Sequence, residues 1–99
     1  MIPSSVRIFV CSEPQDMRRS FDTLSLVVKQ SIGEDPQSGA LFCFVNKRAN
    51  RLKILWYEGN GQCILYKRVH STRFVLPDSR VIDAGQLTEI LRGIDKDKR

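Results

Sequence analysis

Apolar residues recur along this 99-residue chain at two different spacings, and each spacing predicts a different element. Between residues 17 and 32 they return every three or four positions, which is the period of an amphipathic helix. These residues are Met17, Phe21, Leu24, Val28 and Ile32. Asp16 precedes the run and Gly33 follows it, as expected of a helix N-cap and a left-handed C-cap. The pattern predicts a helix over about 17–32.

Five other stretches are short and rich in β-branched or aromatic residues, which is typical of strands. They are residues 7–11, 40–45, 51–58, 62–69 and 72–77. A five-residue loop at 46–50 and a glycine-rich turn at 59–61 join three of them, which predicts an antiparallel meander. Because Pro77 cannot donate a ladder hydrogen bond, the last stretch is expected to be a short edge strand that closes the meander.

The C-terminal quarter predicts a second, shorter helix. Asp83 is expected to be its N-cap, with Gln86 three residues on, and Gly93 is expected to end it. Its apolar stripe consists of Leu87, Ile90 and Leu91. The predicted fold class is α+β: an antiparallel β-meander of about four to five strands, an N-terminal helix packed on one face and a short C-terminal helix. We expect a single domain over 1–99 with a short charged tail at 95–99.

Both faces of the predicted meander are partly apolar. Leu41, Cys43 and Val45 face one way, and Phe42 and Phe44 face the other. The first helix can cover one face. A second helix, a curled sheet or a partner protein could each cover the other face.

The composition is that of a globular protein, with 41% hydrophobic and 27% charged residues. The first residues lack a secretory signal pattern, and no apolar run approaches the roughly 20 residues of a membrane span, so we expect a soluble, cytoplasmic protein without membrane contact. Cys11, Cys43 and Cys63 are odd in number and lie in apolar runs, which favours reduced, buried thiols. With His70 as the sole histidine, no zinc motif is present, and we expect neither metal nor cofactor.

Positive charge is concentrated in one part of the chain. Between Asn46 and Arg73 there are seven basic residues and one acidic residue, Glu58, whereas the remainder has nine basic and ten acidic residues. The seven are Lys47, Arg48, Arg51, Lys53, Lys67, Arg68 and Arg73. Such a cluster on a hairpin creates a directional field for a polyanion.

Two interpretations of this cluster remain open. Basic residues on strands can simply protect an exposed sheet edge from aggregation. Alternatively, they can contact nucleic-acid phosphates while Trp56, Tyr57 or Tyr66 stacks on bases. For the aromatic residues, packing in the core is the simpler explanation, because they alternate within strands that must bury something.

The sequence gives little support for enzymatic chemistry. The carboxylates that could hold a divalent metal are Asp16, Asp22, Asp78 and Asp83, and each lies where a cap, a solvated helix position or a turn explains it. The glycines at 59–61 join two strands and do not open a helix, so they do not form a phosphate-binding loop.

Three stretches resemble a known family. They are "DMRRSFDTLSLVV", "DPQSGALFCFVNKRANRLKIL" and "WYEGNGQCILYKR", and the resemblance runs over about residues 7–93. They are similar to the small TnpB-type accessory proteins of bacterial insertion sequences that have a separate, TnpC-type transposase. The RNA-guided nuclease that is also named TnpB is a different protein. The resemblance implies a non-catalytic protein that assists DNA transposition.

Two hypotheses for the role follow. In the first, the seven basic residues grip the backbone of the transposon-end DNA with little reading of bases. In the second, the chain is an adaptor that binds the transposase through the second apolar sheet face or the stripe of Leu87, Ile90 and Leu91, with basic residues at the rim. DNA binding requires the basic residues on one face, whereas an adaptor requires an exposed apolar patch.

Overall fold

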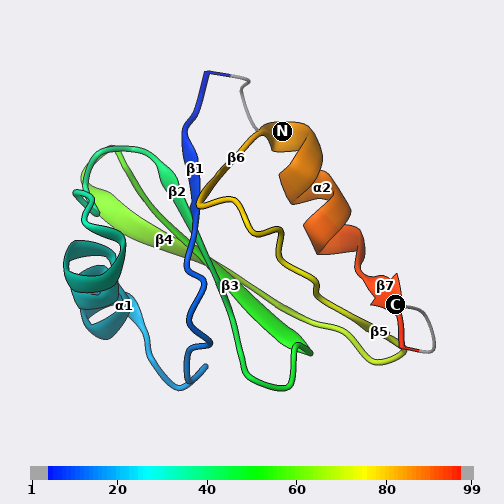
Figure 1. Ribbon diagram of the computed structural model, residues 1–99. Helices are drawn as coiled ribbons and strands as arrows, with labels where there is room; N and C mark the ends of the chain where they lie inside the picture. The colour runs from blue at the N-terminus through cyan, green and yellow to red at the C-terminus, as the bar shows by residue number, and fades with distance from the viewer. Residues whose placement is uncertain (1–4, 97–99) are drawn as a thin grey trace.

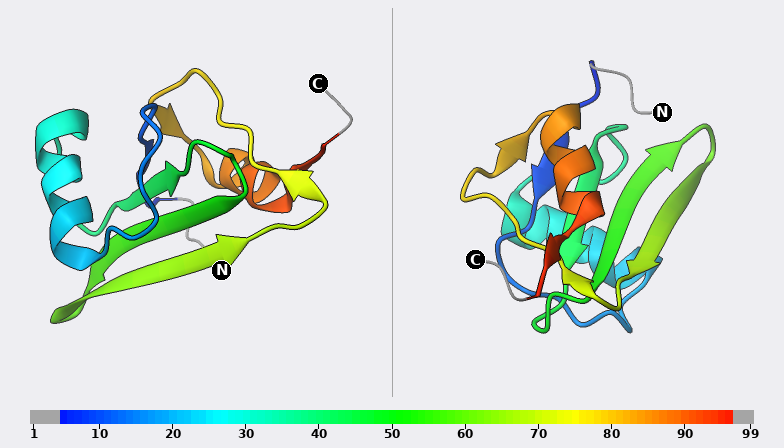
Figure 2. Two further views of the ribbon diagram at one scale, coloured as in Figure 1. Left: turned by 90° about the horizontal axis from the view of Figure 1, so that it is seen from below. Right: turned by 90° about the vertical axis from the view of Figure 1, so that its right-hand side faces the viewer.

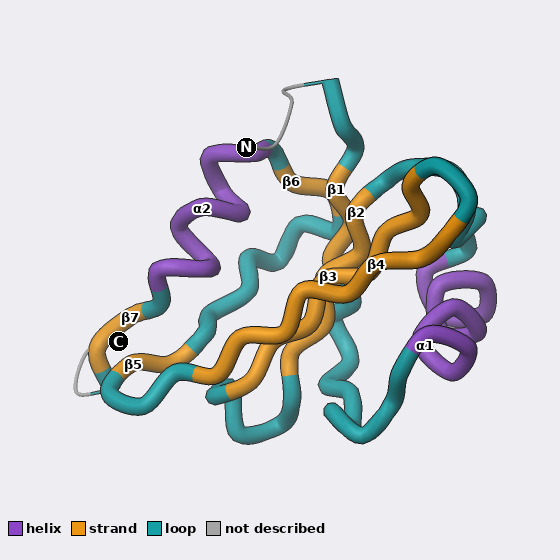
Figure 3. The backbone as a smooth tube through the Cα atoms, turned by 180° about the vertical axis from the view of Figure 1, so that it is seen from behind, coloured by secondary structure: helices purple, strands orange, loops and turns teal. Residues whose placement is uncertain are grey.

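The expected meander exists and forms the larger part of a five-stranded sheet. The computed structural model describes residues 5–96. The elements are, in order, β1 (Ile8–Val10), α1 (Phe21–Val27), η1 (Val28–Ile32), β2 (Leu41–Val45), β3 (Arg51–Glu58), β4 (Gly61–Arg68), β5 (Thr72–Arg73), β6 (Val81–Ile82), α2 (Ala84–Arg92) and β7 (Ile94–Asp95). The η1 segment is a π-helical turn that continues α1. The α+β class is confirmed, with the two helices on opposite sides of the strands (Figure 1; Figure 3).

The strand order in the main sheet is β4-β3-β2-β1-β6. β2, β3 and β4 pair antiparallel, as expected for short connections. β1, however, pairs parallel to β2 and antiparallel to β6. A parallel pair needs a crossover connection, and the segment that contains α1 supplies it. The sequence therefore predicts the meander but not the parallel strand beside it.

The first helix begins later than the apolar spacing predicts. Its N-cap is Ser20, whose N–H donates to the Thr23 hydroxyl at 3.0 Å. Asp16 is not the helix cap, which corrects the prediction: its Oδ1 accepts instead from the backbone N–H of Arg18 at 2.9 Å. Such local side-chain bonds compete with helix formation, so the chain turns here before the helix starts. Gly33, at φ 77°, is the left-handed C-cap, as expected.

Two hydrophobic clusters lie on the two faces of the main sheet. One joins α1 and η1 to Phe42, Phe44 and Leu55, and the other joins α2 to Cys43 and Ile54. The second helix therefore covers the second sheet face, for which the sequence allowed a helix, a curled sheet or a partner protein. Leu87 and Ile90, two of the three residues in the predicted adaptor stripe, are buried in this cluster. The two adaptor surfaces expected from the sequence thus pack against each other, and Leu87 and Ile90 are not available for a partner.

The segment that contains β5 does not close the meander, which is a second correction. β5 pairs antiparallel with β7 in a separate two-stranded sheet. The second helix agrees with its prediction: Asp83 accepts from the N–H of Gln86 at 2.7 Å, and Gly93 is the C-cap. The predicted charged tail begins in β7 at Asp95, and its residues 97–99 lie outside the described part of the chain.

The three cysteines are free thiols. Cys11 and Cys43 are buried as expected, whereas Cys63 is half-buried. Burial raises the pKa of Cys43 to about 12 and also raises the pKa of Cys11, so both are held as neutral thiols at neutral pH. Over residues 5–96, neither helix has the length and apolar character that spanning a bilayer would require.

Candidate nucleic-acid interface

The loop between β2 and β3 is held in one conformation by its first residue. The Asn46 side-chain oxygen accepts from the N–H groups of Asn50 and Arg51, each at 3.0 Å, and its amide donates to the Asn50 side chain at 2.7 Å. Ala49 takes a left-handed conformation, at φ 59°, which lets the chain turn into β3. The side chains at the tip, Lys47 and Arg48, are exposed. The loop therefore presents two cations on an ordered backbone.

The irregular segment before α1, residues 12–20, lies beside this loop (Figure 1). Two hydrogen bonds fix it there: the Gln15 N–H donates to the Val45 carbonyl at 2.9 Å, and the Lys53 ammonium donates to the Arg19 carbonyl at 2.7 Å. An open groove of about 730 Å³ separates segment and loop. Its lining includes Asp16, Arg18, Lys47, Arg48, Arg51 and Tyr66. We refer to it below as the basic groove.

Asp16 and Arg18 form an ion pair at the rim of the basic groove. The Arg18 Nη2 donates to Asp16 Oδ2 at 2.6 Å, and its Nε lies 3.0 and 3.1 Å from the two carboxylate oxygens. These hydrogen bonds lower the pKa of Asp16 to about 2 and raise the pKa of Arg18. The Arg18 side chain is 91% exposed. Asp16 thus orients a guanidinium that remains open to solvent.

Tyr66 lies in the groove between two cations. Arg51 donates to its hydroxyl at 2.8 Å, and the Lys53 ammonium lies 4.9 Å from the centre of its ring. The residue remains 49% exposed. By contrast, Trp56 packs against the α2-side cluster, and Tyr57 is half-buried. Of the three aromatic residues considered for base stacking, Tyr66 is therefore the most exposed.

The structure brings together some of the seven predicted residues and separates others. Lys47, Arg48 and Arg51 line the basic groove. Arg68 is exposed and pairs opposite Arg51 in the β3–β4 ladder, so it lies on the same, α1-side face. Arg73 is in β5. The N–H of the next residue, Phe74, donates to the Ala49 carbonyl at 2.8 Å and holds β5 next to the loop.

The two remaining lysines are engaged inside the fold. Lys53 is only 8% exposed, beneath Tyr66, and its ammonium bonds to Arg19. Lys67 points to the opposite, α2-side face, where it donates to the carbonyl of Leu91 at 2.6 Å near the end of α2. A cation near the C-terminal end of a helix is favoured by the helix dipole. Both ammonium groups are thus used to hold segments of the chain together.

Sequence reasoning missed Arg18 as a groove residue because it lies outside the stretch of concentrated charge. A signal was available, however. Each of the three stretches that carry the family resemblance contributes to the lining of the basic groove through one triplet: Asp16-Met17-Arg18, Asn46-Lys47-Arg48 or Tyr66-Lys67-Arg68. Because the triplets are far apart along the chain, the sequence alone did not indicate that the fold places them together.

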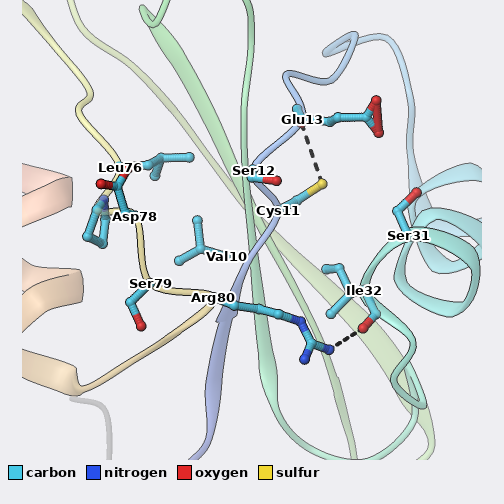
Figure 4. Close-up of a pocket in the computed structure, with 11 residues that line it drawn as sticks. Val10, Cys11, Ser12, Glu13, Ser31, Ile32, Leu76, Asp78, Ser79 and Arg80 are labelled. Carbon is cyan, nitrogen blue, oxygen red and sulfur yellow. Dashed lines mark hydrogen bonds between the residues drawn. The ribbon is translucent and has the colours of Figure 1, made fainter.

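A second cavity, of about 320 Å³, lies at the end of β1 next to Ile32 (Figure 4). Arg80 projects into it and donates to the Ile32 carbonyl, and its guanidinium also pairs with Glu34 at 3.7 Å. Cys11 lies on its wall, with the thiol directed to the Glu13 carbonyl. Within residues 5–96, no three His, Cys, Asp or Glu side chains converge as metal ligands would. Figure 4 shows two hydrogen bonds among the lining residues, from the Cys11 thiol to the Glu13 carbonyl and from Arg80 to the Ile32 carbonyl.

Fold and surface together define a small α+β protein with an ordered basic groove at one end of its sheet. Comparison with known families places it further: the model described as "IS66 Orf2 like protein" matches residues 6–99. The chain therefore belongs to this family, the TnpB proteins of IS66-type insertion sequences, which confirms the resemblance read from its motifs. It is thereby an insertion-sequence-associated accessory protein.

Two curated relatives come from Sinorhizobium fredii (strain NBRC 101917 / NGR234). The uncharacterized protein y4hO is 36% identical over 96% of this chain and 88% of its own length. The uncharacterized protein y4jC is 33% identical over 73% of this chain and 62% of its own length. No solved structure matches the chain.

Proposed function

We propose that this protein is a non-catalytic accessory factor of DNA transposition that binds the phosphate backbone of duplex DNA, including transposon ends, through the basic groove. The binding residues are Lys47, Arg48, Arg51 and Arg68, with Arg18 at the rim. The site of action is the cytoplasm, where the DNA of a bacterial insertion sequence is found.

One observation carries the proposal: exposed cations from three separate segments lie on one face, around an open groove. The loop that holds two of them is ordered by its own hydrogen bonds, so little conformational entropy is lost when a phosphate binds. Arginine suits this task because its guanidinium can donate two parallel hydrogen bonds to one phosphate. The two amide side chains in the lining, Gln15 and Asn46, are hydrogen-bonded within the chain, so we expect weak dependence on DNA sequence.

An adaptor role remains the second candidate, on a different surface from those that the sequence suggested. Phe21 and Leu26 on α1 are 42% and 50% exposed. Large apolar side chains that stay open on a helix can anchor a protein partner. In this alternative, α1 binds the transposase and the chain does not contact DNA.

The test is the salt dependence of DNA binding. Four phosphate contacts predict a slope of log affinity against log salt of roughly −3 to −4 for duplex DNA. The double variant Lys47→Ala/Arg48→Ala should flatten this slope by about 1.8, because each lost contact removes about 0.9. Fluorescence anisotropy with labelled transposon-end and unrelated duplexes measures both quantities. The affinity should fall alike for the two duplexes.

The matched control has the same net charge as Lys47→Ala/Arg48→Ala but loses its two cations outside the groove. Lys29→Ala/Arg92→Ala changes one exposed lysine and one exposed arginine that do not line the groove. We expect this control to retain most of the wild-type slope. If the wild type shows no DNA affinity even at low salt but forms a complex with its transposase, and Leu26→Lys disrupts that complex, the adaptor role replaces the proposal.

A further inference from the structure

β4 forms an open edge of the main sheet. It has eight residues, and β3 is its only partner among the strands of residues 5–96. Figure 2 (left) shows β4 at the border of the sheet, with β3 on one side and no described segment alongside the other. An edge of this length presents a row of unpaired backbone donors and acceptors, which is a template for another strand.

The hairpin determines which backbone groups of β4 point outward. Glu58 and Gly61 pair directly across the two-residue turn, and such a pair exchanges both of its hydrogen bonds. Because hydrogen-bonded and non-hydrogen-bonded pairs alternate in an antiparallel ladder, residues 62, 64, 66 and 68 direct their N–H and C=O groups away from β3. The outer edge therefore offers four residues for pairing with another strand.

Most of this edge lacks the devices that usually prevent pairing, and the exposed cation Arg68 stands at its last position. β4 contains no proline, and its lysine, Lys67, is turned away to bond with the Leu91 carbonyl. Leu65 and Tyr66, in the second half of the strand, are 41% and 49% exposed. β3 and β4 are the longest strands of the sheet, and their exposed large apolar side chains are both on β4, the strand with the free edge.

We propose that the occupant of this edge is a second copy of the chain, paired through β4 in an antiparallel, twofold-symmetric arrangement centred on Leu65. The outward residues permit only registers in which two even-numbered positions face each other. With the axis at Leu65, Ile64 faces Tyr66 of the second copy, and the two Leu65 side chains face each other. These are favourable cross-strand pairs.

The charges of β4 fit this register as well. Arg68 faces Gln62 of the second copy, and Lys67 faces Cys63, so no two cations are opposed. An axis on Ile64 would instead place Tyr66 opposite Gln62, and an axis on Tyr66 would shorten the ladder. The self-complementary sequence of the strand is the reason to prefer a second copy over an unrelated strand.

A twofold axis perpendicular to the sheet keeps the α1-side faces of both copies on one side. Arg51 and Arg68 of each copy then lie on the same surface of one continuous sheet. The pairing itself does not depend on DNA binding, and it can be tested without DNA. If both proposals hold, two basic grooves act together on one duplex or on two.

The first test measures mass against protein concentration by analytical ultracentrifugation. We expect the wild-type chain to have twice the monomer mass, and Leu65→Lys to shift it to the monomer because two ammonium groups would meet at the axis. Val81→Lys is the matched control, since Val81 is 49% exposed on β6 at the opposite edge, and it should remain dimeric. A monomeric wild type, or a dimer that persists in Leu65→Lys, overturns the proposal.

The second test examines the register directly. Leu65→Cys in a Cys63→Ser background should form an intersubunit disulfide when copper phenanthroline accepts the two electrons, because non-hydrogen-bonded partners bring their side chains close. Val81→Cys in the same background should not cross-link. Circular dichroism of each variant verifies that it is folded. Absence of the Leu65 cross-link in a folded dimer excludes this register and overturns the proposal.

Discussion

The loop at 46–50 and the two strands that follow it use the same kinds of cation in opposite ways. In the loop, Lys47 and Arg48 project from an ordered backbone into solvent. In β3 and β4, the ammonium groups of Lys53 and Lys67 bond to backbone carbonyls of segments far away in the sequence. The formal charge is identical, but the strand lysines hold the fold together and the loop cations remain available for a ligand.

A count of charge along the chain therefore does not locate a binding site. A strand residue has its direction fixed by the ladder, so its side chain meets whatever packs on that face. On the α1 side this is the segment before α1, and on the α2 side it is the end of α2. The side chains at the tip of the loop, Lys47 and Arg48, are exposed, so these cations stay solvated.

The largest effect that we predict comes from a matched pair of lysine substitutions. Lys53→Met keeps the aliphatic volume but removes the donor to the Arg19 carbonyl, which should cost roughly 1–3 kcal/mol of unfolding free energy. Lys47→Met removes the same charge from the loop and should change stability by less than about 0.5 kcal/mol. Urea denaturation measures both values.

DNA affinity should distinguish Lys53→Met from Lys47→Met in the opposite order. Lys47→Met should lower affinity and flatten the salt slope by about 0.9, since one phosphate contact is lost. Lys53→Met should retain the wild-type slope wherever the protein remains folded. Equal losses of stability in the two variants would mean that the strand and loop lysines do not differ as described.

Much of the fold could be predicted from local pattern. The meander, both helix C-caps and the Asp83 cap depend on residues close in sequence, whose preferences point to the same structure. The parallel pairing of β1 with β2 could not be predicted, because a three-residue strand carries no signal for its neighbour. The late start of α1 was missed because Asp16 satisfies an N-cap pattern while its side chain binds Arg18.

The candidate site was predictable only in part, for the same reason. The charge cluster included two loop cations, Lys47 and Arg48, that the structure places in the lining of the groove. It could not reveal that Lys53 is buried or that Lys67 faces α2, because both facts depend on contacts more than twenty residues away along the chain. Arg18 lines the groove because the segment before α1 runs beside the loop. No local sequence pattern specifies the course of this segment.

A smaller effect should follow from loosening the loop without removing any charge. Asn46→Ala deletes the acceptor for the N–H groups of Asn50 and Arg51, which we expect to cost about 1 kcal/mol. If the ordered backbone matters for binding, affinity should also fall while the salt slope stays near the wild-type value.

The matched control is Asn60→Ala, in the turn between β3 and β4 at the other end of the ladder. It should leave affinity unchanged. Backbone amide hydrogen exchange of Asn50 and Arg51 measures the loosening directly, and unchanged protection in Asn46→Ala would show that other contacts hold the loop.

The smallest predicted effect concerns the ion pair at the groove rim. Hydrogen bonds from Arg18 hold the pKa of Asp16 at about 2, below its usual value of 3.8. Because this folded-state pKa is depressed, the ion pair stabilises the native state fully above about pH 4 and loses its contribution as the pH falls towards 2. The carboxylate is exposed, so the change in melting temperature should be slight.

An NMR titration of the Asp16 carboxyl carbon checks this directly, and Asp16→Asn provides the reference for stability. The melting temperatures of wild type and Asp16→Asn should differ slightly at pH 5 and converge as the pH falls through the window between 4 and 2. A midpoint close to the ordinary value would mean that Arg18 does not stay on Asp16 in solution. In that case the rim guanidinium is as mobile as any surface arginine, and the ordered part of the groove is reduced to the loop.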